Sequence, residues 1–182
     1  NNVGGTTAGF CVGHVSLPWP NGYLTLWNTN AAGSAASVWN TSPTSNVFGV
    51  GTDLGTNYSG AAYVAYCWAA VAGYSAFGSY TGNGSTDGPF VYTGFRPRFL
   101  MLKRTDTTSD WYIFDSSRNT FNSATKILYP NLSNAEAGYT PPAGFDFLSN
   151  GFKPRETAIN ASGGTYIYAT FAENPFKYAL AR

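Results

Sequence analysis

Few side chains in this sequence could act as a catalytic base or an activated nucleophile. His14 is the only histidine among the 182 residues, so a Ser-His-Asp arrangement would depend on it alone. It lies in a predicted strand, Phe10–His14, where we interpret it as a hydrogen-bonded, partly buried imidazole. We therefore predict no catalytic residue and a protein that is not an enzyme.

Paired carboxylates are the second kind of chemistry that the sequence could support. A glycoside hydrolase needs two of them, roughly 5–5.5 or 6.5–9.5 Å apart. The candidates are Asp106, Asp110, Asp115, Glu136, Asp146, Glu156 and Glu173. Most fall in turns or near Lys and Arg, which favours solvated surface charge. A polysaccharide depolymerase using paired carboxylates remains the alternative to a non-enzymatic protein.

Metal ligands are scarce as well. Zinc sites need clusters of Cys and His, and the sequence has two cysteines and one histidine. The turn with Asn83, Ser85 and Asp87 offers oxygen ligands but lacks the further carboxylates of a good calcium site. We expect no metal and no cofactor. Cys11 and Cys67 are interpreted as small buried hydrophobic residues in strands, with a disulfide between them as the alternative.

Four aromatic side chains are candidates for binding a glycan: Trp19, Tyr23, Trp39 and Tyr58. Sugars bind to aromatic faces and to Asn, Asp, Ser and Thr in shallow sites that need little charge. These rings fall in or beside segments rich in Pro, Gly, Asn and Ser, where we expect them to be exposed. The alternative is that they cover the ends of a β-sandwich.

Charge is scarce and unevenly distributed. Only 10% of residues are charged, 17% are aromatic, and the net charge is +1. All ten Lys and Arg lie at or beyond Arg96, whereas residues 1–95 hold only Asp53 and Asp87. Because the N-terminal half cannot neutralise a phosphate backbone, we predict no nucleic-acid partner. The apolar stretch Tyr63–Phe77 is shorter than the roughly 20 residues of a membrane-spanning helix, so we predict no membrane span.

The elements that must position these side chains are short β-strands. Runs rich in Tyr, Phe, Val and Ile alternate with clusters of Gly, Pro, Asn and Asp, and no long window keeps a helical period. The predicted strands are Tyr23–Trp27, Ala62–Ala70, Phe90–Thr93, Phe99–Arg104, Trp111–Asp115, Lys126–Tyr129 and Thr165–Ala172. Asn83-Gly84 and Asp87-Gly88 indicate turns, so Ala76–Thr93 is predicted to be a hairpin. We predict an all-β fold, an antiparallel β-sandwich built as one unit or as two small tandem ones.

The sequence repeats itself at an offset slightly above 100 residues. Three pairs of segments align in order: Gly60–Ala69 with Gly163–Ala172, Leu26–Trp27 with Leu128–Tyr129, and Phe10–His14 with Trp111–Asp115. Residues 1–74 are therefore predicted to be a first β-repeat, 75–94 the connecting hairpin, and 95–182 a second β-repeat. The strand Phe99–Arg104 has no counterpart in the first repeat, which is thus N-terminally incomplete.

Several motifs occur together in the C-terminal two-thirds of the chain. They are Phe77–Phe95, Phe99–Asp106, Phe147–Lys153, Tyr166–Ala169 and Phe171–Lys177. Together they resemble a recurrent module of tailed-bacteriophage virion proteins, closely over residues 63–182 and more loosely over 1–62. The biochemical function of that module is undefined, and it often closes large tail-fibre or adhesin-like chains. The resemblance implies a non-enzymatic structural protein of a tail fibre or capsid appendage, with no catalytic residues to transfer.

The charge-poor half of the chain also bears on assembly. Interface cores are depleted of charge and enriched in aromatic residues, and virion fibres are usually symmetric homo-oligomers. We expect identical subunits, as a trimer or another symmetric homo-oligomer, and other virion proteins as partners, on an extracellular virion particle. Attachment to a host-surface glycan is a further expectation. A capsid-decorating protein that stabilises the shell is another alternative.

Overall fold

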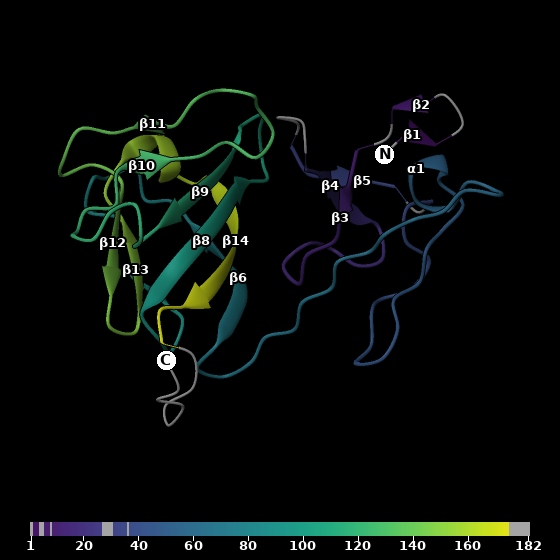
Figure 1. Ribbon diagram of the computed structural model, residues 1–182, viewed down its shortest axis with the longest axis horizontal. Coiled ribbons are helices and arrows are strands. Elements are labelled where there is room, and N and C mark those ends of the chain that lie inside the picture. The colour runs from purple at the N-terminus through teal and green to yellow at the C-terminus, as the bar shows by residue number, and fades with distance from the viewer. Residues whose placement is uncertain (1, 4–5, 8, 27–30, 36, 175–182) are drawn as a thin grey trace.

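The computed structural model describes the chain except residues 1, 4–5, 8, 27–30, 36 and 175–182 (Figure 1). The described residues form several small antiparallel sheets in an almost entirely β, sandwich-like fold, which confirms the predicted fold class. Helical structure in this part of the chain is limited to α1 (Leu54–Asn57) and a 3-10 helix at Thr157–Ile159. Neither helix has the length or apolar character to cross a membrane.

A four-stranded antiparallel sheet lies at the centre of the C-terminal part. Its strand order is β6 (Ser75–Thr81), β14 (Thr165–Ala172), β8 (Pro97–Arg104) and β9 (Trp111–Asp115). β14 is paired on both edges, with β6 and with β8, over nearly its whole length. Its β-branched and aromatic residues favour extended backbone, and the two neighbouring strands supply the hydrogen bonds that fix it.

A second sheet packs against one face of the central sheet and closes a β-sandwich (Figure 1). Its strands, in order, are β12 (Phe145–Leu148), β13 (Gly151–Pro154) and β7 (Val91–Tyr92); β10 (Lys126–Ile127) and β11 (Ala137–Gly138) pair beside it. Phe145 meets Phe114 with ring centroids 4.8 Å apart, and Phe152 meets Tyr168 at 5.2 Å. These edge-to-face aromatic contacts fill the core between the sheets.

The part of the chain around β3 (Cys11–Val12) and β4 (Gly22–Thr25) packs on the opposite face of the central sheet. β4 also pairs with β5 (Gly33–Ser34), and β1 (Asn2–Val3) pairs with β2 (Thr6–Thr7) in a separate two-stranded sheet. Leu17 and Leu24 pack with Trp111 and Ile167 in a small buried cluster. The Trp111 indole N–H also donates to the Thr25 carbonyl at 3.1 Å. Apolar contact and hydrogen bonding therefore hold the N-terminal part on the sheet.

Most predicted strands occur in the structure. The agreement is closest for Phe99–Arg104, Trp111–Asp115 and Thr165–Ala172, which are β8, β9 and β14. Two others are shorter than predicted, Phe90–Thr93 as β7 and Lys126–Tyr129 as β10. The predicted strand Tyr23–Trp27 occurs as β4, and its last residue, Trp27, lies outside the described residues. Runs of aromatic and aliphatic residues indicated most of these strands, whereas in β6 small residues separate the aromatic Phe77 and Tyr80.

The predicted strand Ala62–Ala70 is wrong. This stretch runs as an extended trace between α1 and β6, and all of its residues are exposed (Figure 1). None of its backbone N–H groups donates to another described residue. Strand propensity cannot form a strand without a neighbour, because the ladder hydrogen bonds come from another segment. Cys67 is therefore neither buried nor in a strand, Cys11 is partly buried, and both are free thiols.

The predicted hairpin Ala76–Thr93 is also wrong. β6 pairs with β14 and β7 pairs with β13, so the two strands belong to different sheets. The chain crosses between the sheets through a loop that Asn160 holds. The Asn160 side chain is fully buried and donates to the Asn83 side-chain oxygen and to the Ser85 carbonyl, each at 2.6 Å. The β-unit that was predicted to begin at residue 95 thus also uses strands from residues 75–94.

The internal repeat is present in the local structure at an offset of 103 residues. Asp53 caps α1 by accepting from a backbone N–H, and Glu156 caps the 3-10 helix in the same way. Gly60 and Gly163 follow, and both take positive φ, of 77° and 72°. Glycine adopts this left-handed conformation without steric cost. The two copies therefore share a capped helical turn followed by the same change in chain direction.

A tyrosine completes this shared unit in both copies. The Tyr63 hydroxyl accepts from the Tyr58 N–H at 2.8 Å, and the Tyr166 hydroxyl accepts from the Ala161 N–H at 3.0 Å. After this tyrosine the copies differ. The second copy continues as β14, whereas the first continues as the exposed stretch Ala62–Ala70.

Candidate functional site

Trp19 and Trp39, two of the predicted glycan-binding residues, pack against each other. Their ring centroids lie 5.5 Å apart, and Trp39 is only 7% exposed. The Trp19 indole N–H donates to the His14 carbonyl at 3.0 Å. A Cβ at Gly13 would lie 2.4 Å from the Trp19 ring, so glycine allows the ring to approach the backbone. The prediction that Trp39 is exposed is therefore wrong, because the Trp19 ring packs against it and the side chain is buried.

Tyr23 and Tyr58 occupy other environments. Tyr23 is half-buried in β4, close to Gly33, and lines a shallow hollow of about 290 Å³. Tyr58 follows α1 and is 41% exposed. Among the four predicted side chains, ring contacts in the described structure join only the two tryptophans. The structure therefore does not gather the four into one aromatic site.

His14 is partly buried and hydrogen-bonded, as predicted. Its Nε2 lies 3.0 Å from the Tyr168 carbonyl oxygen, and its Nδ1 accepts a hydrogen bond from the Ser16 N–H at 3.1 Å. Because a carbonyl oxygen can only accept, Nε2 is the donor and carries the proton. Burial lowers the pKa of the imidazole, and the hydrogen bond to Tyr168 opposes that shift. The geometry is that of a neutral imidazole that links the N-terminal part to β14.

Basic side chains pair with most of the carboxylates that were candidates for glycoside hydrolysis. Asp115 and Glu136 both pair with Arg118, at 2.5 and 2.9 Å. The hydrogen bonds from Arg104 lower the pKa of Asp106 to about 2, and those from Arg118 lower the pKa of Glu136. The remaining candidates also have partners: Asp110 with Asn131, Asp146 with Arg155, Glu156 with the 3-10 helix and Glu173 with Arg96. A general acid needs a raised pKa, and these shifts have the opposite direction.

The side-chain oxygens of the turn with Asn83, Ser85 and Asp87 interact with other groups of the protein. Asp87 pairs with Lys153 at 2.7 Å and also with Arg155. The Asn83 side-chain oxygen accepts from Asn160 and from the Ser85 N–H. Within the described ranges, no group of three His, Cys, Asp or Glu side chains is arranged to hold a metal ion.

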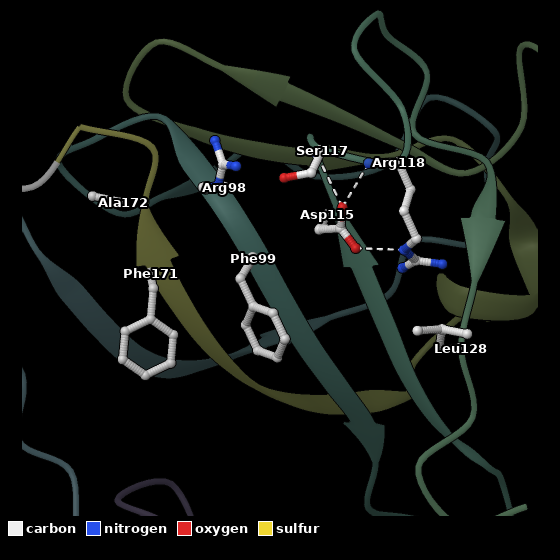
Figure 2. Close-up of a pocket in the computed structure, with 8 residues that line it drawn as sticks. All are labelled: Arg98, Phe99, Asp115, Ser117, Arg118, Leu128, Phe171 and Ala172. Atoms are coloured by element: carbon white, nitrogen blue, oxygen red, sulfur yellow. Dashed lines mark hydrogen bonds and ion pairs between the residues drawn. The ribbon is translucent and has the colours of Figure 1, made fainter. Parts of the chain in front are cut away.

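An open hollow of about 470 Å³ lies at one end of the central sheet (Figure 2). Phe99 and Phe171 lie on adjacent strands in its wall, with ring centroids 5.9 Å apart. In the view of Figure 2, Arg98 lies above the two rings, and Arg118 with its partner Asp115 lies to the right of Phe99. An aromatic wall beside guanidinium groups suits a ligand with a flat apolar face and hydroxyl or carboxylate groups. No local sequence pattern marks this hollow, because strand pairing brings its residues together.

Large apolar side chains are exposed along the stretch Ala62–Ala70, which we call the exposed aromatic segment. Tyr66 and Trp68 are each 65% exposed and Val64 is 57% exposed. The Tyr66 ring stacks on Trp68 with centroids 6.2 Å apart and contacts Phe10 at 6.1 Å. Contiguous exposed apolar surface is typical of interaction sites rather than of free protein surface. The sequence indicated strand character here, but the exposure follows only from the structure.

Comparison with known proteins identifies the family of the chain. Residues 2–175 match a family described as a domain of unknown function, DUF7483. No similar sequence was found among curated proteins, and no similar fold was found among solved structures. Because the match spans both sequence repeats and the whole described fold, this chain belongs to the DUF7483 family.

Proposed function

We propose that this protein is a non-enzymatic structural component of a tailed-phage virion, which assembles with identical copies into a tail-fibre or capsid appendage. The observation that carries the proposal is the exposed aromatic segment. Val64, Tyr66 and Trp68 present apolar surface to solvent on a stretch without backbone pairing to other described residues. Covering such surface by association is favourable, because apolar area leaves water.

The distribution of charge supports the same proposal. Residues 54–86 contain no charged side chain, and they include both the exposed aromatic segment and β6. Charged side chains instead form ion pairs within the C-terminal part, such as Arg118 with Asp115 and Arg155 with Asp146. Depletion of charge beside exposed aromatic rings is the composition of an interface core.

The motifs that resemble virion modules lie mainly in structural positions. Phe147 and Phe152, from the motif Phe147–Lys153, are buried between the two sheets, and so is Tyr166 of β14. The motifs therefore act on the stability and shape of the sandwich. That role supports a structural component of a particle, on which repeated copies must have one defined shape.

Attachment to a host-surface glycan is the second candidate function, and the hollow in Figure 2 favours it. Phe99 and Phe171 could lie against a sugar ring while Arg98 binds its hydroxyl or carboxylate groups. A glycan array tests this function with the wild-type protein and Arg98→Ala. Binding that falls by tenfold or more in the variant supports the hollow as the site, and binding to no glycan contradicts it.

The assembly proposal is tested by multi-angle light scattering at micromolar concentration. A trimer or another defined oligomer is expected, and a monomer contradicts the proposal. Labelled antibodies on intact particles test the location, because label on the capsid shell alone would favour the capsid-decorating alternative. Release of reducing ends from host polysaccharide, abolished by changing one Asp or Glu, would instead establish the depolymerase.

A further inference from the structure

The exposed aromatic segment begins as β14 begins. Gly60 and Gly163 turn the chain in the same left-handed conformation, and Tyr63 and Tyr166 each accept a backbone N–H from five residues upstream. At the same offset, Val64 aligns with Ile167 and Trp68 aligns with Phe171. The segment therefore has both the entry geometry and the side-chain pattern of a strand.

The difference between the two copies lies in their neighbours. β14 pairs with β6 on one edge and with β8 on the other. The first repeat has no counterpart of β8, whose sequence Phe99–Arg104 occurs once in the chain. With no strand beside it, the segment leaves its N–H groups without described protein partners. A missing neighbour, and not an unsuitable sequence, explains why this stretch is not a strand.

The segment is attached at both ends, which keeps it away from the chain's own strands. At its start, the Tyr63 hydroxyl donates to the Leu54 carbonyl at 2.9 Å. At its end, the Val71 N–H donates to the Ser75 carbonyl at 3.1 Å, next to the turn at Gly73. The N-terminal part is itself held on the central sheet through His14 and Tyr168. Folding back along β6 would require that part to leave the sheet.

The same chain offers a complementary strand edge. β6 pairs only with β14 among the described strands, and at seven residues it is the longest of those at a sheet edge. Natural edge strands are usually protected from further pairing by charged side chains, especially Lys, or by Pro. The strand Ser75–Thr81 contains no charged residue and no Pro. An unprotected edge of this length is expected to be covered in the assembled protein.

We propose that the exposed aromatic segment of one chain pairs, as an additional β-strand, with the free edge of β6 in a second copy of the chain. This inference rests on the proposed assembly and names the contact that makes it. The exposed aromatic segment is similar in sequence to β14, which already pairs with β6. This similarity favours a second copy of the chain over an unrelated protein as the partner. Because each chain supplies one segment and one edge, two copies can pair by reciprocal exchange as a two-fold dimer, and more copies can pair head to tail in a ring if the rotation between them closes.

The side chains of the segment are already arranged for this contact. Tyr66 and Trp68 lie two residues apart and stack at an interplanar angle of 24°, so they share one face of an extended backbone. Covering Val64, Tyr66 and Trp68 would remove roughly 300–400 Å² of apolar surface from water at each contact. Main-chain hydrogen bonds would supply affinity, and the alternating side chains would set the register.

A proline substitution tests strand pairing apart from side-chain contact. Ala65 is exposed and its N–H donates to no described residue, so Ala65→Pro breaks no hydrogen bond of the described chain, whereas the fixed φ and missing N–H of proline disfavour pairing as a strand. We expect Ala65→Pro to dissociate the oligomer at concentrations at which Ala65→Ser remains assembled, with at least a tenfold difference in dissociation constant. Circular dichroism and the unfolding midpoint check that both variants fold.

Hydrogen exchange on the wild-type protein gives a second measurement that needs no variant. Amides of residues 62–70 should be protected at high protein concentration and should exchange freely after dilution to monomers. An oligomer that persists in Ala65→Pro, or whose residues 62–70 exchange freely, overturns strand pairing and leaves the assembly proposal standing. A wild-type monomer at all concentrations removes both.

Disulfide cross-linking from the exposed thiol of Cys67 tests which strand accepts the segment. Ser79→Cys and Thr81→Cys each place a second thiol on an exposed position of β6. Opposite residues of antiparallel strands are close enough for a disulfide, so at least one variant should form dimers and higher species under mild oxidation. The same changes with Cys67→Ser are the controls. No interchain disulfide in either variant overturns the assignment to β6.

Discussion

Removing the Asn160 side chain should destabilise the fold more than its position in a loop suggests. Its amide donates to the Asn83 side-chain oxygen and the Ser85 carbonyl, each at 2.6 Å, and its oxygen accepts the Asn83 N–H at 3.1 Å. Each such bond contributes about 0.5–1.5 kcal/mol net, so Asn160→Ala should lower the free energy of unfolding by about 1.5–4.5 kcal/mol. At about 3 °C per kcal/mol for a domain of this size, the middle of that range lowers Tm by about 9 °C.

The repeat supplies a matched control for this change. Asn57 occupies the equivalent position 103 residues earlier, but its side chain is exposed and makes one bond, to the Gly51 carbonyl at 2.8 Å. Asn57→Ala should therefore cost about 0.5–1.5 kcal/mol. Urea unfolding followed by tryptophan fluorescence measures both variants against the wild-type protein. If Asn160→Ala costs no more than Asn57→Ala, the loop does not depend on the buried amide.

Three further predictions follow from buried groups and close contacts. Burial lowers the pKa of Lys103 to about 8, so the folded state binds fewer protons than the unfolded state above that pH. Lys103 should contribute about 2 kcal/mol more to stability at pH 9.5 than at pH 7, so in a urea series at several pH values the wild-type protein should gain about that much relative to Lys103→Met. Ellman's reagent should react quickly with Cys67 and slowly with Cys11, whose pKa burial raises, in protein diluted to monomers; Cys67→Ser should remove the fast phase. Gly82→Ala places a Cβ 2.1 Å from the Ala161 carbonyl oxygen and should lower the free energy of unfolding by about 1–3 kcal/mol, measured by calorimetry.

The strands of the C-terminal part were largely predictable from the sequence. β9 and β14 combine aromatic and β-branched residues in short runs, and β8 contains the apolar run Phe99–Leu102. β6 (Ser75–Thr81) was expected only as part of the hairpin Ala76–Thr93, and its actual partner is β14, which is distant in the sequence. Composition therefore predicted where strands form better than which strands pair.

The candidate binding residues were less predictable. Loop position suggested exposure for Trp39, but the neighbouring Trp19 ring packs against it and it is 7% exposed. The hollow in Figure 2 combines Phe99 with Phe171, which are 72 positions apart and become neighbours only through the register of β8 and β14. No local pattern marks such a pair, because register depends on the whole sheet.

The sequence by itself determined the β class, the positions of the best strands and the internal repeat. Those properties depend on local composition and on glycines such as Gly60 and Gly163, whose positive φ turns the chain in both copies. Only the tertiary structure decided which copy of the repeated strand is formed. Thr165–Ala172 lies between two strands and becomes β14, whereas Ala62–Ala70 has none of the described strands beside it and stays exposed. The physical reason is that a strand forms its backbone hydrogen bonds with neighbouring strands, and its own residues do not specify which strands those are.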